Sequence, residues 1–230
     1  MSDEDRRFRF ALIAMGLVLT ENVIGALTAA GWRWVSLSTA FTCLVMLTWT
    51  ARTRDPVMVR WLLIGLVAGW IEITTDWWLV AKTSTLVYHA TEPKVLDSPV
   101  YMPFAWTVVL AQIGVVSGWL AKRMSLGMAI LATALIGGTT IPLYEHLAHD
   151  ADYWYYRDTP MLFSAPYYII LAEFLICLPL PWLNRLAVAR SLPWSAGCGL
   201  AAGVWMFPCV WIAWKLVGPC SGAVIQFACK

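Results

Sequence analysis

Charged residues are scarce in this chain. Of its 230 residues, 16 are Lys or Arg and 14 are Asp or Glu, so 13% are charged, whereas soluble domains carry about 25%. So few charges cannot cover a water-facing surface, which excludes a disordered chain and an ordinary soluble enzyme. The formal net charge of +2 is too small to indicate a nucleic-acid partner.

Familiar motifs are absent as well. The sequence contains no Rossmann glycine pattern, P-loop, GxSxG or HExxH. Six cysteines are present, but none has the CxxC spacing of a zinc or iron–sulfur site. We find no internal sequence repeat, which argues against a transporter built from two related halves.

Long apolar runs dominate what is present. Hydrophobic residues make up 60% of the chain, and seven runs approach the ~20 residues that a helix needs to cross a bilayer. No run alternates with period two, and backbone groups in lipid must pair within their own helix. We therefore predict an all-α protein, with residues 1–230 forming a single domain of seven transmembrane helices. The runs are roughly Phe8–Ala30, Trp34–Ala51, Val57–Ala81, Val100–Ala121, Leu126–Leu147, Met161–Leu183 and Ala196–Val217.

The basic residues predict the orientation, because cytoplasmic loops are enriched in Lys and Arg. The side with the N-terminus has ten and the other side six, so we expect a cytoplasmic N-terminus, an outer C-terminus and insertion in the cell (inner) membrane. Residues 218–230 would form a short extracytoplasmic tail, in which Cys220 and Cys229 are either disulfide-bonded or free thiols. The ten are Arg6, Arg7, Arg9, Arg52, Arg54, Arg60, Lys122, Arg123, Arg185 and Arg190, and the six are Arg33, Lys82, Lys94, Arg157, Lys215 and Lys230.

Ionisable residues inside the spans are the main functional candidates. A charge at the bilayer centre costs at least ~2.5–3.5 kcal/mol, so such residues face the bundle interior. No Lys or Arg lies in the span interiors to pair with them, and we expect most of the acids to be protonated or metal-bound. The candidate catalytic acids are Glu21, Glu72, Asp76, Glu145 and Glu173, with the polar residues Asn22 and Gln112 beside them.

Glu72 and Asp76 stand four residues apart, so both project from one helix face. A neutral acid beside a carboxylate can perform general acid/base chemistry. Trp70, Trp77 and Trp78 surround the pair in sequence and are expected to line the same pocket. The alternative is a structural pair that bonds a Thr or Tyr of a neighbouring helix.

Glu145, His146 and His149 follow the helical spacing by which helix bundles hold metal ions. A divalent metal would be the cofactor under this interpretation; the alternative is an ordinary solvated helix end. The same run contains the segment 137–142, Gly-Gly-Thr-Thr-Ile-Pro. It predicts either a helix break that lines a cavity or close packing through small residues.

Two aromatic residues precede the last acid. Tyr167 and Tyr168 stand shortly before Glu173, and a Tyr can bond a carboxylate or stabilise a cation through its ring face. Glu21 and Asn22 on the first span are either part of the site or a hydrogen-bonded staple between helices. The predicted substrate-binding residues are Asn22, Trp70, Gln112, Tyr167 and Tyr168.

One stretch carries a family resemblance. Trp154-Tyr155, Pro166 and Glu173-Phe174 resemble the aromatic pair and following Pro–Glu helix of the membrane carotenoid enzymes, the lycopene cyclases and carotenoid hydratases. The related membrane terpene cyclases share the same general plan. Those cyclases have Pro close to a double Glu, whereas here Pro166 lies seven residues before a single Glu. The resemblance implies cofactor-independent cyclisation or hydration of a lipophilic polyene taken from the bilayer.

Three hypotheses remain. The first is an isoprenoid enzyme whose acid/base set is Glu72, Asp76 and Glu173, with no cofactor and a lipophilic substrate. The second is a metal-dependent membrane enzyme that uses Glu145, His146 and His149. The third is a transporter or a non-enzymatic subunit of a membrane complex, in which the acids relay protons or bind a cation.

Overall fold

Seven helices of the chain are long and apolar enough to cross a membrane, as the sequence predicts. The computed structural model describes residues 2–188 and 190–219; the predicted tail beyond Pro219, with Cys220 and Cys229, lies outside them. The helices are α1 (Asp3–Thr28), α2 (Gly31–Thr53), α3 (Pro56–Trp77), α4 (Met102–Arg123), α5 (Leu126–Asp150), α6 (Tyr167–Cys177), α7 (Leu180–Val188) and α8 (Leu192–Val217). The π-helix η1 (Trp78–Thr83) extends α3.

Polar residues in the sequence start several of these helices. The Ser2 hydroxyl accepts a hydrogen bond from the Asp5 amide at the start of α1. The Asp55 carboxylate accepts bonds from two amides at the start of α3, where Pro56 has the first helical position. Side-chain acceptors satisfy amides that have no partner within the helix, and Pro is well suited to the first turn.

The sixth predicted span, Met161–Leu183, is interrupted in the structure. Residues 161–166 form a strand hairpin, so the helix begins at Tyr167. It then breaks between α6 and α7 at Pro179, which has no amide hydrogen to continue the helical ladder. α6 and α7 together still form one candidate span, Tyr167–Ala187.

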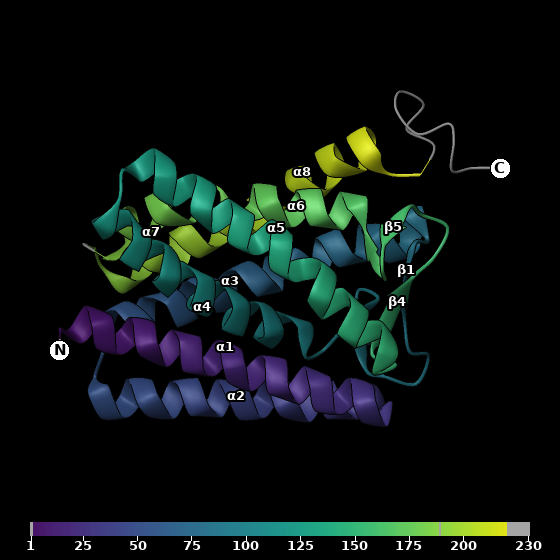
Figure 1. The fold of residues 1–230 in the computed structure, drawn as a ribbon, viewed down its shortest axis with the longest axis horizontal. Coiled ribbons are helices and arrows are strands. Elements are labelled where there is room, and N and C mark those ends of the chain that lie inside the picture. The colour runs from purple at the N-terminus through teal and green to yellow at the C-terminus, as the bar shows by residue number, and fades with distance from the viewer. Residues whose placement is uncertain (1, 189, 220–230) are drawn as a thin grey trace.

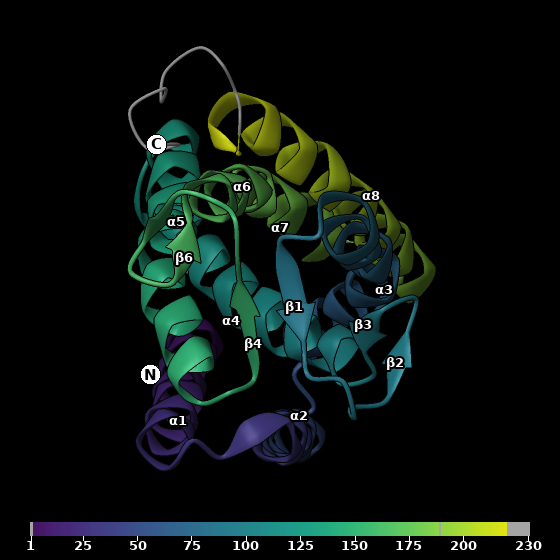
Figure 2. The same cartoon turned by 90° about the vertical axis from the view of Figure 1, so that its right-hand side faces the viewer.

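Short strands gather at one end of the bundle, which we call the strand end (Figures 1 and 2). β1 (Leu86–Tyr88) pairs antiparallel with β4 (Trp154–Tyr156). Two hairpins flank this pair, β2 (Lys94–Val95) with β3 (Ser98–Pro99) and β5 (Met161–Leu162) with β6 (Ala165–Pro166). Strands of two or three residues are too short to produce a periodic pattern, so the sequence did not predict them.

The order of elements repeats although the sequence shows no repeat. A helix, a strand, a hairpin and a second helix follow one another as α3–β1–β2–β3–α4 and again as α5–β4–β5–β6–α6. Each hairpin ends with a Pro, Pro99 or Pro166, shortly before the second helix. The β1–β4 pair joins the two units, which brings the strand ends of α3 and α5 toward each other.

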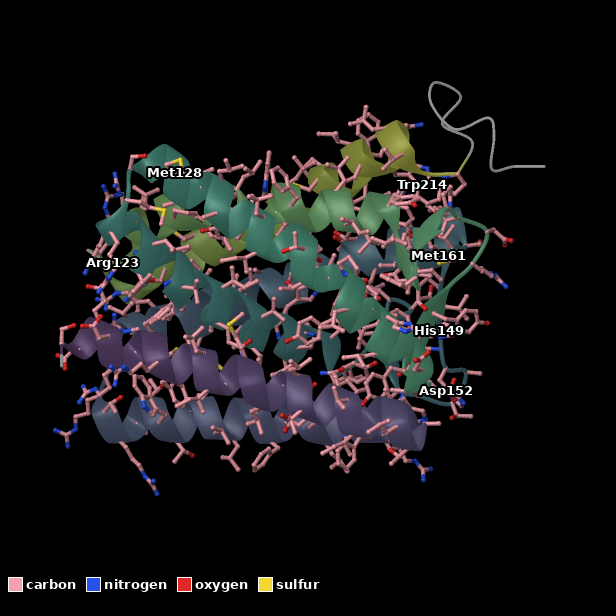
Figure 3. All side chains as sticks on the ribbon, viewed as in Figure 1. Arg123, Met128, His149, Asp152, Met161 and Trp214 are labelled. Carbon is pink, nitrogen blue, oxygen red and sulfur yellow. The ribbon has the colours of Figure 1, made fainter. Side chains whose placement is uncertain are left out.

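The helices form two unequal layers. α1 and α2 run side by side along one flank, and the other helices form the body of the bundle (Figure 1). Charged side chains such as Arg123 and Asp152 lie at the two ends, while apolar side chains cover the flanks (Figure 3). Leu27, Ile13 and Leu37 are 82%, 70% and 69% exposed, as expected of side chains that face lipid rather than water.

Close packing of α3 on α4 depends on glycine. A Cβ atom at Gly69 would lie 2.5 Å from the Pro103 carbonyl oxygen, whereas one at Gly16 on α1 would meet nothing within 4 Å. We expect Gly69→Ala to destabilise the protein by about 1–3 kcal/mol, because the helices must separate, and Gly16→Ala to be neutral or stabilising. Thermal melting of the purified variants checks this; equal melting temperatures for the two would contradict it.

Candidate functional site

A cavity of about 230 Å³ lies among α1, α2, α3, α4, α5, α6 and α8, with β1 and β4 at its strand end. All five predicted acids line this cavity, together with Asn22 and Gln112. The sequence could not show that these side chains converge, because it does not say which helices are neighbours. The structure brings the acids together from α1, α3, α5 and α6.

Asp76 is a well-held hydrogen-bond acceptor. It is 5% exposed, and its Oδ2 accepts bonds from the Tyr88 hydroxyl at 2.6 Å and the Ser98 hydroxyl at 2.7 Å. Tyr88 ends β1 and Ser98 begins β3. Because both partners donate, they favour the ionised form of Asp76.

Glu72 lies one helical turn below Asp76 and is 4% exposed. Its carboxyl lies near that of Asp76 and near the Trp106 indole, while its Oε2 has no partner among the described residues. Two adjacent carboxyls in an apolar interior are unfavourable when both are ionised, so we expect the pair to hold a proton. Since the two hydroxyl donors are on Asp76, Glu72 is the member expected to carry it.

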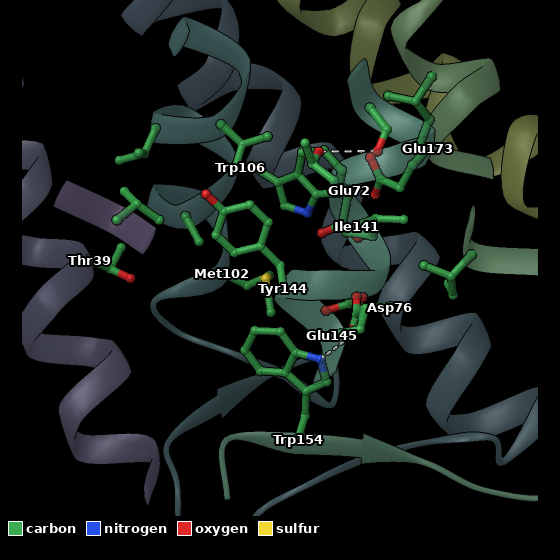
Figure 4. A pocket seen from close by; sticks show the side chains of 18 of the residues that line it. Thr39, Glu72, Asp76, Met102, Trp106, Ile141, Tyr144, Glu145, Trp154 and Glu173 are labelled. Carbon is green, nitrogen blue, oxygen red and sulfur yellow. Dashed lines mark hydrogen bonds between the residues drawn. The ribbon is translucent and has the colours of Figure 1, made fainter. Parts of the chain in front are cut away.

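Glu145 is held in a similar way on α5. The Trp154 indole donates to its Oε2 at 2.7 Å, and the Tyr156 hydroxyl lies 3.4 Å from its Oε1. Figure 4 shows Trp154 rising from β4 to Glu145, which lies beside Asp76. Tyr88 and Tyr156 each end the strand that follows the helix of their acid. The repeated element order therefore gives both carboxylates a Tyr donor.

Glu173 on α6 is partly buried and lines the same cavity. It lies close enough to both Glu72 and Glu145 to interact with their charges. Within residues 2–188 and 190–219, no hydrogen-bond donor is seen on its carboxyl. Glu173 therefore belongs to the same group of acids on the cavity wall as Glu72 and Glu145.

Glu21 forms the predicted interhelical staple and also lines the cavity. Its carboxyl accepts a bond from the Thr42 hydroxyl of α2 at 2.9 Å, and its backbone carbonyl accepts one from the Trp34 indole at 2.9 Å. These bonds join α1 to α2 as an interhelical staple. Asn22 donates to the Val18 carbonyl within α1 at 2.8 Å, and both side chains line the cavity.

Three predicted substrate-binding aromatics lie elsewhere. Trp70 and Tyr167 are 46% and 40% exposed, and neither lines the cavity. Trp70 is two residues before Glu72, about 200° around the helix, so it faces outward. Tyr168 is buried and bonds Thr85 at 2.9 Å, outside the cavity wall. All three are near an acid in sequence, but this proximity did not predict correctly that they line the cavity.

The proposed metal ligands do not point to one place. Glu145 faces the cavity, whereas His149 is exposed and contacts Asp150. His146 lies 3.2 Å from the Ser164 hydroxyl. Among the described residues, no three His, Cys, Asp or Glu side chains are grouped as metal ligands would be.

The glycine segment of α5 lines the cavity and packs closely on α6, but the helix break that the sequence suggested is not seen in the described residues of this helix. Gly137 and Thr140 line the cavity. Gly137 also permits close packing on α6, since a Cβ there would lie 2.5 Å from the Cys177 sulfur. The helix continues through Pro142 to Asp150.

The aromatic part of the cavity wall was largely missed from sequence. Trp106, Tyr144, Trp154, Tyr156 and Tyr88 all line it. Trp154 and Tyr156 alternate along β4, which is the one local signal that could have placed two side chains on the same side. The pairing of β1 with β4 could not be inferred from either segment alone.

Glu92, outside the spans, is another buried acid at the strand end. It is 5% exposed, neither carboxyl oxygen has a partner in the described part of the chain, and burial raises its pKa from 4.5 to about 7, against the opposing effect of Lys94. Because the unfolded chain ionises first, the stability should fall as the pH rises from about 4.5 to about 7 and then level off. Melting temperatures across this range should show the fall in the wild type and a smaller one in Glu92→Gln; equal slopes would contradict it.

The fold and the site together define a multi-pass helical membrane protein with a carboxyl-lined internal cavity. Residues 73–217 match the family described as Domain of unknown function (DUF6989), and the chain belongs to that family. No curated protein and no solved structure matches the chain. The matched region contains Asp76, Glu145 and Glu173, while Glu21 and Glu72 precede it.

Proposed function

We propose that the protein is a membrane-embedded acid/base enzyme that cyclises or hydrates a lipophilic polyene of the isoprenoid or carotenoid type. The observation that carries the proposal is the pairing of Glu72 with Asp76 on a cavity that aromatic side chains also line. An acid kept neutral by burial can protonate an alkene, and ring faces stabilise the resulting cation. The resemblance to the carotenoid and terpene cyclases agrees with this chemistry.

The reaction begins at Glu72. Its unpartnered oxygen transfers a proton to one carbon of a double bond, and the π electrons form the new C–H bond. The other carbon becomes a carbocation in a cavity that the aromatic side chains of Trp106 and Trp154 line. A second double bond of the substrate then closes a ring, or a water oxygen adds to the cation.

A second carboxylate completes the reaction. Glu145, which accepts the Trp154 indole hydrogen, takes a proton from a carbon next to the new cation or from the added water. The product is then neutral, and Glu72 must regain its proton. Glu173 interacts with both Glu72 and Glu145, so it is placed to return that proton. The cycle is balanced and consumes no cofactor.

The substrate would enter from the bilayer. The distribution of Lys and Arg supports a cytoplasmic N-terminus in the cell (inner) membrane. This orientation places the strand end, and with it Asp76 and Glu145, on the outer side. The apolar flanks of the bundle then face the lipid in which such a substrate dissolves.

Expression in a bacterium that makes lycopene and related polyprenes tests the proposal. Membrane extracts are compared by mass spectrometry with those of cells that carry the empty vector. We expect a new product that is either isomeric with a host polyprene or heavier by one water. Unchanged extracts, with the protein present and folded in the membrane, would count against this substrate class.

A further inference from the structure

Gln112 is a buried residue of the cavity wall whose amide nitrogen has no partner in the described part of the chain. It lies on α4 and is 4% exposed, and no acceptor for its Nε2 hydrogens exists among residues 2–188 and 190–219. A buried N–H group that lacks an acceptor is unfavourable. On its own helix, the residues next to it that also line the cavity are apolar: Val108, Val109 and Ile113.

The position of Gln112 relative to the acids is informative. It lies six residues beyond Trp106 on α4, which is ~9 Å along the helix axis, and Trp106 contacts Glu72. The cavity is continuous between them, since both residues line it. A ligand whose double bond meets Glu72 can therefore extend to the amide.

The charges of the cavity restrict what that ligand carries. No Lys, Arg or His lines the cavity in the described part of the chain, whereas five acids do. A phosphate or carboxylate group would have no positive partner and would face the acids, which is strongly unfavourable in an apolar site. A pure hydrocarbon would leave the Gln112 amide unpaired.

We propose that Gln112 binds a neutral oxygen atom, a hydroxyl or carbonyl, at one end of the lipophilic polyene. This inference rests on the proposed function and narrows its substrate class. The amide donates to the oxygen, and this contact fixes how far the chain reaches toward Glu72. Hydrocarbon polyenes and prenyl phosphates are then poorer ligands than polyene alcohols or ketones.

Binding of three matched probes tests the proposal. The full chain in lipid nanodiscs is titrated with retinol, with the hydrocarbon that lacks its hydroxyl, and with retinyl phosphate, and quenching of tryptophan fluorescence is measured. We expect retinol to bind about tenfold more tightly than either other probe. Gln112→Met, similar in size but unable to donate, should weaken retinol binding to the hydrocarbon level.

Phe104→Leu is the control, because Phe104 lies on the same helix as Gln112 but is 40% exposed and does not line the cavity. It should retain the preference for retinol. Equal affinities in the wild type, a preference that survives Gln112→Met, or no binding by a folded protein would overturn the inference. Binding is measured without turnover, so the two proposals can fail separately. A protein that prefers retinol over the other two probes but makes no product would contradict the proposed function alone. A protein that makes product but binds the three probes equally would contradict only the inference about Gln112.

Discussion

Glu72→Gln should abolish product formation while leaving the fold intact. The amide keeps the size of the carboxyl but cannot give a proton to an alkene, and loss of a general acid lowers the rate by about 10²–10⁴-fold. Glu72 is the member of the Glu72–Asp76 pair whose Oε2 is free of hydrogen bonds among the described residues. Product yield per amount of membrane protein, from the polyprene-producing bacterium, is the measurement.

The control is Asp97→Asn, which makes the same chemical change on an exposed residue of the β2–β3 turn. Asp97 has a φ of 64°, a conformation that Asn adopts readily, so this variant should make product at the wild-type level. Helix content and melting temperature of Glu72→Gln should match the wild type, since an amide removes the need to hold a proton between two acids. Undiminished product from a folded Glu72→Gln protein would refute the role of Glu72.

Composition alone predicted most of the fold. Seven apolar runs became seven candidate spans, because a bilayer accepts only segments that satisfy their own backbone groups. The run Met161–Leu183 was misjudged at its start and in its interior, each time for a local reason. The apolar residues 161–166 can sit in a hairpin as well as in a helix, and Pro179 divides what remains.

The site was predicted in part by the cost of burying charge. Glu21, Glu72, Asp76, Glu145 and Glu173 were chosen because lipid would expel an unpaired acid, and all of them line one cavity. The cost of exposing an acid to lipid depends on the residue type and not on which helices are neighbours. This cost carries no information about aromatic side chains, which are equally at home in lipid and in a cavity.

The aromatic predictions failed for that reason. Trp70 faces outward although it is near Glu72 in sequence, while Trp106, from a different helix, contacts that acid. Two of the donors, Tyr88 on Asp76 and Trp154 on Glu145, stand opposite each other in the β1–β4 pair, which joins segments almost 70 residues apart. Such contacts depend on the tertiary fold and have no local signal.

Asp55→Ala should cause the largest loss of stability among the variants considered. Asp55 is 3% exposed; both of its oxygens lie 2.9 Å from the Nε of Arg7, and one lies 2.8 Å from a terminal guanidinium nitrogen. It also caps α3 through the amides of Val57 and Met58. Removing one partner of a buried ion pair costs about 3–5 kcal/mol, because the other charge stays buried without compensation.

Two further variants separate the ion pair from the cap. Asp55→Asn keeps a good capping side chain but loses the charge, so its melting temperature should fall between those of the wild type and Asp55→Ala. Asp3→Ala removes an ion pair with Arg6 at the surface, where the Asp3 side chain is 80% exposed. This variant should have nearly the wild-type stability. If Asp55→Ala and Asp3→Ala had the same melting temperature, the buried ion pair would not stabilise the contact between α1 and α3. Because α1 also carries Glu21 and Asn22 to the cavity, the ion pair joins a helix of the candidate site to α3 at the opposite end of the bundle.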